Sequence, residues 1–364
     1  MDEAPSAPGA EMRGRARSFR EPPCYAALDL GTNNCRLLIA KPQGTGFRVV
    51  EAYSRIVRLG EGLAQSGRLG EHAMERALAA LKVSAEKIRR RNVSRLRAIA
   101  TQACRIADNG PDFVARVAEE TGIRLQVIPP QEEARLSVAG CLGLLDRTQD
   151  AALVVDVGGG STEMSWLDLA ADRHAEQPQM RAWLSIPIGV VTLAEQFPEG
   201  EAATETWFRA MVECVKSEIE GFSRADGLKP VFAADRAHLI GTSGAITSLA
   251  GLHLQLPRYD RSQVDGIWMT RGDCDAAAAR LLALGPGERA EQPCIGPDRA
   301  DLVLAGAAIL QAVQELWPCS RVRVADRGLR EGILMSLMSQ RNGRRRRRRR
   351  GNGSAGPAAV AGAA

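Results

Sequence analysis

Two short glycine-rich segments carry the residue types that bind phosphate groups. Each directly follows an apolar run that ends in an aspartate, Asp29 in the first case and Asp156 in the second. The turn residues are Gly31, Thr32 and Asn33 after the first aspartate, and Gly158, Gly159, Gly160, Ser161 and Thr162 after the second. A tight glycine-rich turn exposes several backbone N–H groups on one side, and that concavity suits phosphate oxygens. Either segment alone is compatible with a structural β-turn, but the matched pair favours phosphate binding.

Carboxylates beside these turns could hold a metal ion. Asp29 and Asp156 each end a strand, and two such acids facing one another across a cleft would bind a hydrated magnesium ion, directly or through water. Glu163, just past the second turn, could join them. The four histidines and eight cysteines are scattered and form no CxxC pair, which argues against a zinc site.

A third segment, residues 241–244, follows an apolar strand and opens a helix. Its members are Gly241, Thr242, Ser243 and Gly244. Helix N-termini with small polar residues bind anions, although the same residues also form ordinary N-caps. Arg105, just past another strand, could contact a phosphate through both arms of its guanidinium, or lie solvated on the surface.

Two adjacent acids, Glu132 and Glu133, stand at the start of a helix that Pro129 and Pro130 introduce. The helix dipole favours an acid in the first turn, so spacing alone favours a capping role. The catalytic interpretation is that one of the two is a general base, which takes a proton from a water that attacks phosphorus.

Strands and helices alternate along the chain, which predicts an α/β fold with mixed layers. Strands are predicted at 25–29, 36–40, 49–53, 96–100, 125–128, 151–156, 164–167, in a run ending at 240, and at 322–325. Helices are predicted at 71–90, 111–120, from near 131, at 204–222, directly after 241–244, and at 274–284, 299–316 and 329–339. The strand–turn–strand pattern at Asp29 recurs at Asp156, which indicates a duplicated α/β domain.

Charge is unevenly distributed along the chain. The formal net charge is +5, but Arg341 and the run Arg344–Arg350 carry eight positive charges, so the rest of the chain is −3. Composition therefore does not indicate a strongly basic nucleic-acid-binding domain. No apolar run reaches the roughly 18 residues of a membrane span, and residues 1–24 lack the apolar core of a signal peptide. Because the scattered cysteines suit a reducing compartment, we expect a cytoplasmic protein.

Seven segments occur in the order that is typical of one family. They are AALDLGTNNCRLLIA (within 25–40), ATQACRIADN (100–109), QEEARLSVAG (131–140), VVDVGGGSTEM (154–164), IGTSGAITSL (240–249), DRADLVLAGAAIL (298–310) and RGLREGIL (327–334). The chain resembles the exopolyphosphatase/guanosine pentaphosphate phosphatase family (Ppx/GppA), in a short two-domain form, over about residues 25–340.

This resemblance implies two ribonuclease-H-like domains, of the type found in actin, sugar kinases and heat-shock chaperones, flanking an interdomain cleft. It implies hydrolysis of a terminal phosphoanhydride of inorganic polyphosphate or guanosine pentaphosphate with Mg2+, with or without a monovalent cation, in a homodimer. By the same resemblance, Glu133 is the base that activates water and Asp156 binds metal or water. The implied metal ligands are Asp29, Asp156 and Glu163, and the implied phosphate-binding residues are Gly31, Thr32, Asn33, Arg105, Gly158, Gly159, Gly160, Ser161, Thr162, Gly241, Thr242, Ser243 and Gly244.

The chain departs from the family's pattern at three places. The first turn has Thr32, Asn33 and Asn34 where Ser-Asn-Ser is common, which removes one hydroxyl. Pro129-Pro130 stands where Ser-Gly is frequent, and Pro130 has no N–H to donate. Cys294 follows Pro293 where glycine is frequent. These departures bear on positioning and substrate preference.

Two other functions suit the same superfold: a nucleotide-dependent phosphotransferase, and a non-catalytic regulator that binds guanosine tetra- or pentaphosphate. Residues 25–137 and 138–340 are expected to form the two domains. The last helix could also pack back on the first domain. Residues 1–24 and 341–364 are expected to be disordered tails. The run Arg344–Arg350 could capture polyphosphate, could bind RNA or ribosomes, or could have no selected role.

Overall fold

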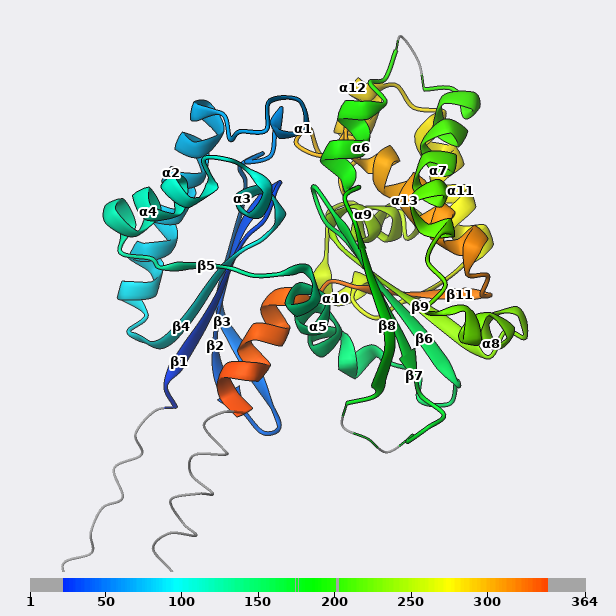
Figure 1. Cartoon of the computed structure of the whole chain (residues 1–364), viewed down its shortest axis with the longest axis horizontal. Helices are drawn as coiled ribbons and strands as arrows, with labels where there is room; N and C mark the ends of the chain where they lie inside the picture. Colours follow the sequence, from blue (N-terminus) through cyan, green and yellow to red (C-terminus); the bar gives the residue numbers. More distant parts are fainter. Residues whose placement is uncertain (1–21, 174, 176, 201–202, 340–364) are drawn as a thin grey trace, which may run out of the picture.

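Two mixed β-sheets organise the chain, and helices pack on both faces of each (Figure 1). The computed structural model describes residues 22–339 except 174, 176, 201 and 202. The first sheet has the order β3 (Gly46–Ile56), β2 (Asn34–Gln43), β1 (Cys24–Leu30), β4 (Val93–Ala100), β5 (Leu125–Val127). The second has the order β10 (Trp268–Thr270), β11 (Arg321–Ala325), β9 (Ala237–Thr242), β6 (Ala151–Val157), β7 (Thr162–Asp168), β8 (Gln179–Ile186).

The helices divide between the two sheets. Those before the second sheet are α1 (Leu63–Ser66), α2 (Glu71–Arg90), α3 (Gln102–Ile106), α4 (Gly110–Thr121) and α5 (Pro130–Cys141). Those after it begins are α6 (Val190–Gln196), α7 (Glu205–Glu220), α8 (Lys229–Ala233), α9 (Gly244–His253), α10 (Arg261–Val264), α11 (Arg271–Leu282), α12 (Pro286–Glu291), α13 (Val303–Leu316), and a final helix over residues 329–339. Among the described helices, none combines the length and apolar character that a membrane span requires.

The same topology occurs twice, as the repeated sequence pattern predicts. β1 and β2 form an antiparallel hairpin with β4 parallel to β1, and β6 and β7 form an antiparallel hairpin with β9 parallel to β6. The register is also equivalent, since Asp29 lies opposite Arg36 and Asp156 lies opposite Glu163. We call the first sheet with α1–α4 the first lobe, and the second sheet with α5–α13 the second lobe. The α/β class with two actin-like sheets is confirmed.

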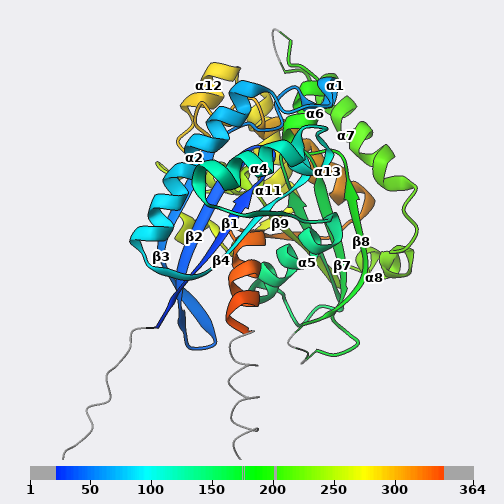
Figure 2. The ribbon, with the colours of Figure 1, turned by 60° about the vertical axis from the view of Figure 1, so that its left-hand side comes forward.

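Both faces of the central strands are buried, which explains their nearly continuous apolar sequences. In β1, Ala26, Leu28 and Leu30 pack toward α2, α3 and α4, whereas Tyr25 and Ala27 pack on the opposite face (Figure 2). The amphipathic spacing of α2 buries its apolar stripe against this sheet, and its last turn carries Lys and Arg where the helix dipole favours them.

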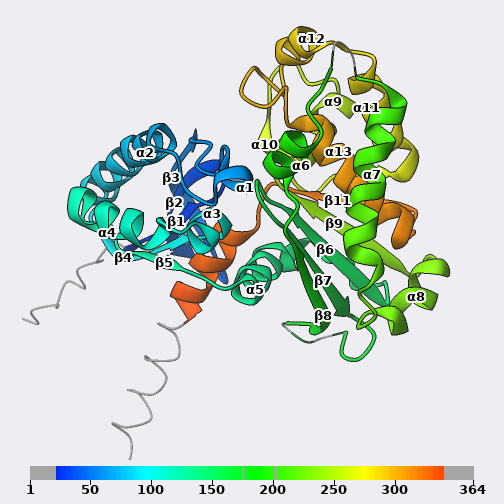
Figure 3. The ribbon, with the colours of Figure 1, turned by 45° about the horizontal axis from the view of Figure 1, so that its top comes forward.

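The space between the two sheets holds α5 and the final helix (Figure 3). Ile333, Leu334 and Leu337 of the final helix pack on the inner face of the first sheet. Val138 and Cys141 of α5 pack on the inner face of the second. The two helices therefore link the two sheets, and α5 spans the position 137/138 at which a division into two domains is predicted.

Most predicted helices and strands are found within a few residues of their expected bounds. Some elements of the structure were not predicted. The first strand begins at Cys24, so that residue belongs to β1 and not to an N-terminal arm. The edge strand β8 was not expected, although its apolar residues Met180, Ala182, Leu184 and Ile186 occupy every second position. Of the predicted disordered tails 1–24 and 341–364, residues 1–21 and 341–364 lie outside the described residues.

Candidate active site

A cavity of about 260 Å³ lies between the two lobes and is lined by residues of both. The predicted site residues that line it are Asp29, Gly31, Thr32, Asn33, Glu133, Asp156, Gly158, Gly159, Gly160, Ser161, Glu163, Thr242, Ser243 and Gly244. The structure thus brings residues of all three predicted loops to one place, together with Asp29, Glu133, Asp156 and Glu163. Cavities between lobes that carry convergent polar groups are the usual location of binding sites.

The two glycine-rich turns have the same internal geometry. The N–H of Gly31 donates to the carbonyl of Asn34 at 2.8 Å, and that of Gly158 donates to the carbonyl of Ser161 at 2.9 Å. Within the described chain, no backbone partner accepts from the N–H groups of Thr32, Asn33, Gly159 or Gly160. Unpaired N–H groups in two facing turns suit the oxygens of a phosphate chain.

The second turn approaches the first so closely that only glycine fits. A Cβ on Gly159 would lie 2.9 Å from the backbone nitrogen of Asn33, and one on Gly160 would lie 2.9 Å from Thr32 Oγ1. A Cβ on Gly189 would lie 2.4 Å from the carbonyl carbon of Gly159, so the turn is also enclosed from behind. The absence of side chains lets amides of opposite lobes face one ligand.

Glu133 enters the cavity from the first turn of α5. Its side chain is buried, and Oε2 accepts from Arg105 Nη1 at 3.3 Å. Burial raises the pKa of Glu133 well above its ordinary value, the nearby Glu163 raises it further, and Arg105 opposes the shift. Glu132, by contrast, does not line the cavity and is bound by Arg97 and Arg135. Of the two adjacent acids, only Glu133 is placed to act on a ligand there.

Three further carboxylates, Asp29, Asp156 and Glu163, line the cavity. Asp156 Oδ2 accepts a hydrogen bond from Ser137 of α5, and Glu163 Oε1 accepts from Ser185 Oγ at 2.8 Å. Burial raises the pKa of Asp29 to about 6 and that of Glu163 to about 7, and Asp156 contributes to both shifts. Burial also raises the pKa of Asp156. The cavity is therefore poised to accept a cation or to release protons near neutral pH.

Three predicted phosphate-binding residues do not line the cavity. Arg105 lies behind Glu133 and also donates to the carbonyl of Ile128 at 2.7 Å. Thr162 is fully buried, with its hydroxyl donating to the carbonyl of Ile188 at 2.7 Å. Gly241 lies inside β9, under Ile246. These residues lie behind the loops and help to hold them in place.

The third loop leads from β9 into α9. Ser243 adopts a φ of 148°, which is rare outside glycine, and its Oγ accepts from the N–H of Ile246 at 3.3 Å as the N-cap. Thr242 Oγ1 donates to the carbonyl of Arg327 at 2.8 Å. The loop thus fixes the N-terminus of α9 at the cavity wall and ties it to the segment before the final helix.

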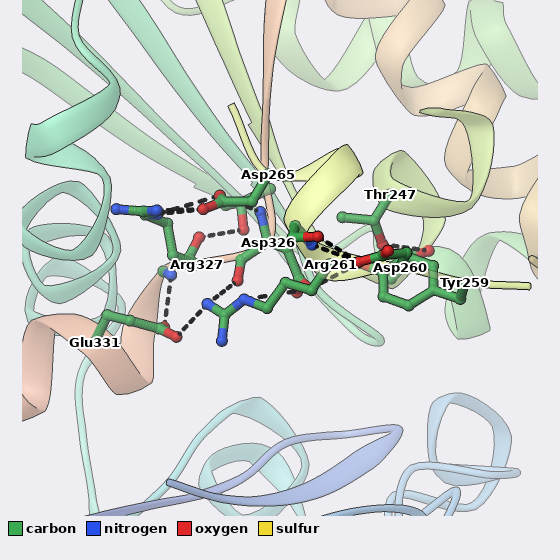
Figure 4. Close-up of polar contacts among 12 residues, drawn as sticks. Thr247, Tyr259, Asp260, Arg261, Asp265, Asp326, Arg327 and Glu331 are labelled. Carbon is green, nitrogen blue, oxygen red and sulfur yellow. Dashed lines mark hydrogen bonds and ion pairs between the residues drawn. The ribbon is translucent and has the colours of Figure 1, made fainter. Parts of the chain in front are cut away.

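The far end of the cavity is built by a polar network around the C-terminus of β11 (Figure 4). Tyr259 Oη donates to Asp326 Oδ2 at 2.7 Å, and Arg261 Nη2 donates to Glu331 Oε1 at 3.0 Å. Glu331 Oε2 also accepts from the N–H of Gly328 at 2.9 Å, which caps the final helix. Arg327 is held by Asp265. This network fixes the start of the final helix beside the loops.

The model of the Ppx/GppA phosphatase family matches residues 38–341. The chain belongs to this family. Exopolyphosphatase 2 of Mycobacterium tuberculosis is 30% identical over 326 residues, which are 86% of this chain and 98% of that protein. The solved Ppx/GppA member of Aquifex aeolicus matches with a TM-score of 0.71 and 29% identity, covering 88% of this chain and 99% of its own. A solved exopolyphosphatase-like protein matches with a TM-score of 0.77 and 30% identity, covering 87% of this chain and 98% of its own.

Four arginines that line the cavity of this Ppx/GppA member are not among the predicted site residues: Arg36, Arg299, Arg327 and Arg330. Two of these arginines stand at sequence positions where a positive charge is unusual, and that could have marked them as functional. Arg36 is a charge within an apolar strand, and Arg330 places a positive charge in the first turn of a helix, where the dipole disfavours it.

Whether a magnesium ion fits can be judged from the carboxylates themselves. Within the described part of the chain, no three His, Cys, Asp or Glu side chains converge closely enough to hold a metal together. Asp29 Oδ1, however, is buried and has no hydrogen-bond partner, and the half-buried Asp156 pairs across the hairpin with the buried Glu163. Magnesium commonly keeps several waters and binds only one or two carboxylates. The donor set therefore fits a hydrated magnesium ion and does not form a complete protein cage.

The raised pKa of Glu163 predicts a pH-dependent stability effect. Below pH of about 4.5 the carboxyl is neutral in both the folded and the unfolded chain, and its burial costs little. Between pH 4.5 and about 7 only the unfolded chain loses the proton, so stability falls as pH rises. Glu163→Gln removes this loss, and we expect it to raise the free energy of unfolding at pH 8 by about 1–3 kcal/mol in metal-free buffer.

Urea unfolding at pH 4.5 and pH 8 measures this effect. The advantage of the Glu163→Gln variant is expected at pH 8 and should nearly vanish at pH 4.5. Glu119→Gln, on the exposed face of α4, is the matched control and should change stability equally little at both. An equal difference between the Glu163→Gln variant and the parent at both pH values contradicts the assignment of Glu163 as a destabilising buried charge.

Proposed function

We propose that the protein is a phosphoanhydride hydrolase that removes the terminal phosphate of inorganic polyphosphate, of guanosine pentaphosphate to give the tetraphosphate, or of both. The observation that carries the proposal is the position of Glu133, whose buried carboxylate faces a cavity walled by two matched phosphate-type turns. The exopolyphosphatase name of the M. tuberculosis relative, which this chain covers almost completely, supports this reaction class.

In the proposed mechanism, the terminal phosphate lies between the unpaired amides of the two turns. Those amides point toward the place where negative charge develops, so they stabilise the transition state without reorganising. Glu133 orients a water molecule and accepts its proton as the oxygen attacks phosphorus in line. Arg105 holds the carboxylate by its hydrogen bond and favours the ionised form that can accept the proton.

The carboxylates of Asp29 and Asp156, with Glu163 beside them, would hold a hydrated magnesium ion. When bound, the ion supplies positive charge that offsets the charge of the phosphate oxygens. In its absence the buried acids repel an anionic substrate, because like charges interact strongly where water is excluded. A metal requirement therefore follows from the acidity of this wall.

Orthophosphate release from the purified protein tests the proposal, with long-chain polyphosphate and guanosine pentaphosphate assayed side by side. Each assay is run with magnesium and with excess chelator. We expect release from at least one substrate with magnesium, and a loss of at least tenfold with chelator. No release from either substrate contradicts the proposed reaction, and full activity in chelator contradicts the proposed metal.

A further inference from the structure

Positive charge is concentrated at the end of the first lobe that lies away from the cavity. Residues 41–51 and 86–95 contain seven Lys or Arg and two Glu, a net charge of +5. The chain without the eight arginines near its C-terminus is −3, so the overall composition conceals this local charge. We call the seven residues the basic end: Lys41, Arg48, Lys87, Arg89, Arg90, Arg91 and Arg95.

Strands of the first sheet place part of the basic end where β1 begins. Lys41 lies directly opposite Arg48 in the β2–β3 ladder, and Arg95 lies near the start of β4, which runs parallel to β1. At about 3.3 Å per residue, the strand from Cys24 to Asp29 spans roughly 17 Å. Since Asp29 lines the cavity, the basic end lies on the opposite side of the lobe from it.

The carboxylate of Glu51 does not neutralise the helical part of the basic end. Lys87 Nζ and Arg90 Nη2 of α2 each lie 2.7 Å from Glu51 Oε1, and Arg91 Nε lies 2.6 Å from Oε2. Hydrogen bonds from Lys87 and Arg91 lower the pKa of Glu51 to about 2. Because three cations share one anion, an excess of positive charge remains around it.

Two exposed arginines of the basic end have no protein partner. Within the residues that the structure describes, neither Arg48 nor Arg89 makes a side-chain hydrogen bond or an ion pair. Arg89 also lines a surface hollow of about 380 Å³, together with Val83, Glu86, Lys87 and Arg90. Both guanidiniums are therefore accessible to an anion from outside the chain.

Helix capping is the alternative role for the residues of α2, since a helix C-terminus favours cations. It does not account for Lys41, Arg48 and Arg95, which lie on three different strands. Directly opposed like charges, such as those of Lys41 and Arg48, destabilise a pair of strands. A bound anion would offset this repulsion.

The second lobe repeats the topology of the first but does not repeat this excess of charge. Near the start of β6, Asp150 forms ion pairs with both Arg173 and Arg236. Beside it, at the end of β7, Asp168 pairs with Arg181. Arginines at this end of the second sheet are thus matched by acids, whereas those at the equivalent end of the first sheet are not.

The chemistry of the basic end favours RNA as its partner. Six of its seven cations are arginines, whose planar guanidiniums bind phosphates through two N–H groups and stack on unpaired bases. The final helix ends at the same place, because Arg95 Nη1 donates to the carbonyl of Leu337 at 3.4 Å (Figure 1). Arg341 and the run Arg344–Arg350 follow this helix in the sequence, and arginine-rich segments are common in RNA-binding proteins.

Two other polyanions suit the basic end less well. Peripheral binding to a lipid surface relies on an apolar helix face that can insert, and the apolar stripe of α2 is packed on the first sheet. Polyphosphate as a substrate must reach the cavity, which lies at the opposite end of β1. RNA needs neither an inserted face nor access to the cavity.

We propose that the basic end is a docking surface for RNA and that the arginines after the final helix extend it. The surface contacts sugar–phosphate backbone and leaves the cavity accessible, so RNA is a partner of the protein and not its substrate. The proposal goes beyond the proposed function and does not depend on it.

Fluorescence anisotropy of the full chain with a labelled RNA hairpin of about 16 base pairs tests the surface. A protein that carries both Arg48→Gln and Arg89→Gln is expected to bind with a Kd raised about 10-fold, and with a salt dependence reduced by about two phosphate contacts. Arg55→Gln with Arg124→Gln removes the same charge from exposed positions of the same lobe, and should change Kd by less than about twofold. Deletion of residues 341–364 should raise Kd by about 10-fold or more.

An unchanged Kd in the Arg48→Gln/Arg89→Gln protein overturns the docking surface, even if the deletion abolishes binding. An equal loss in the control protein overturns it too, because only net charge would then matter. Tighter binding to vesicles that contain phosphatidylserine, to long-chain polyphosphate or to a DNA duplex, at equal phosphate concentration, overturns the choice of RNA. Thermal unfolding identifies a double variant that fails to fold, and Arg89→Gln alone then decides.

Orthophosphate release separates this proposal from the proposed function. The Arg48→Gln/Arg89→Gln protein should keep its rate of release within about twofold, because neither residue lies at the cavity. A parent protein that binds RNA through the basic end but hydrolyses neither substrate would support the docking surface and contradict the hydrolase.

Discussion

Replacing Glu133 by glutamine is expected to lower kcat for orthophosphate release by about 10²- to 10⁴-fold, the usual contribution of a positioned general base. Glutamine keeps the size of the side chain and an acceptor for Arg105, but its amide cannot take a proton from water. KM should change by less than about threefold, because substrate binding rests on the turn amides and on other side chains. Steady-state kinetics on the better of the two substrates gives both constants.

The neighbouring acid offers a matched control for this result. Glu132→Gln changes the same kind of side chain one residue earlier on α5, outside the cavity, where Arg97 and Arg135 bind it. Its kcat should stay within about twofold of the parent.

The kcat of the parent protein should also rise with pH through the raised pKa of Glu133, since only the ionised carboxylate accepts the proton. This rise of kcat with pH should be absent in the Glu133→Gln variant. A Glu133→Gln protein with near-parental kcat would contradict the assignment of the base.

The duplicated hairpins are the part of the fold that the sequence predicts best. An apolar run, an aspartate, a glycine turn and a returning strand are all local features, and they occur at both Asp29 and Asp156. The structure adds that the two aspartates hold equivalent register positions in their hairpins. Spacing alone does not choose between Glu132 and Glu133, but the direction of α5 does, since only Glu133 faces the cavity.

Features that depend on contacts between distant segments escape local reasoning. Arg36 and Arg299 are 263 positions apart, and their convergence on Gly244 depends on how the lobes meet. Thr162 and Gly241 belong to matching motifs, yet neither lines the cavity, because the Thr162 hydroxyl is bonded to Ile188 behind the loop and Gly241 lies within β9 under Ile246. A motif therefore identifies the loop, and the tertiary structure decides which of its atoms are presented to a ligand.

Replacing Gly332 by alanine is expected to lower the free energy of unfolding by about 2–4 kcal/mol, although alanine is the better helix former. Gly332 lies where the final helix crosses α5, and a Cβ there would lie 1.9 Å from the carbonyl oxygen of Leu136. On the other side of the crossing, a Cβ on Gly140 would lie 1.9 Å from the carbonyl oxygen of Gly328. Backbone atoms cannot rotate away as a side chain can, so the two helices must separate.

In a Gly→Ala substitution, the higher helix propensity of alanine raises the free energy of unfolding, whereas steric overlap of its Cβ lowers it. A second helical glycine, which has room for a Cβ, shows the effect of propensity alone. Gly272→Ala, within α11, places a Cβ no closer than 3.8 Å to any atom and should be neutral or stabilise by up to about 1 kcal/mol. Denaturant unfolding of the two variants should therefore give changes of opposite sign, and a Gly332→Ala variant as stable as the parent would contradict the tight crossing.

Because Leu136 lies three residues after Glu133 on the same helix, separation of the helices also displaces the base. We therefore expect kcat to fall at temperatures where the Gly332→Ala variant is still folded, since small displacements of a catalytic group are costly.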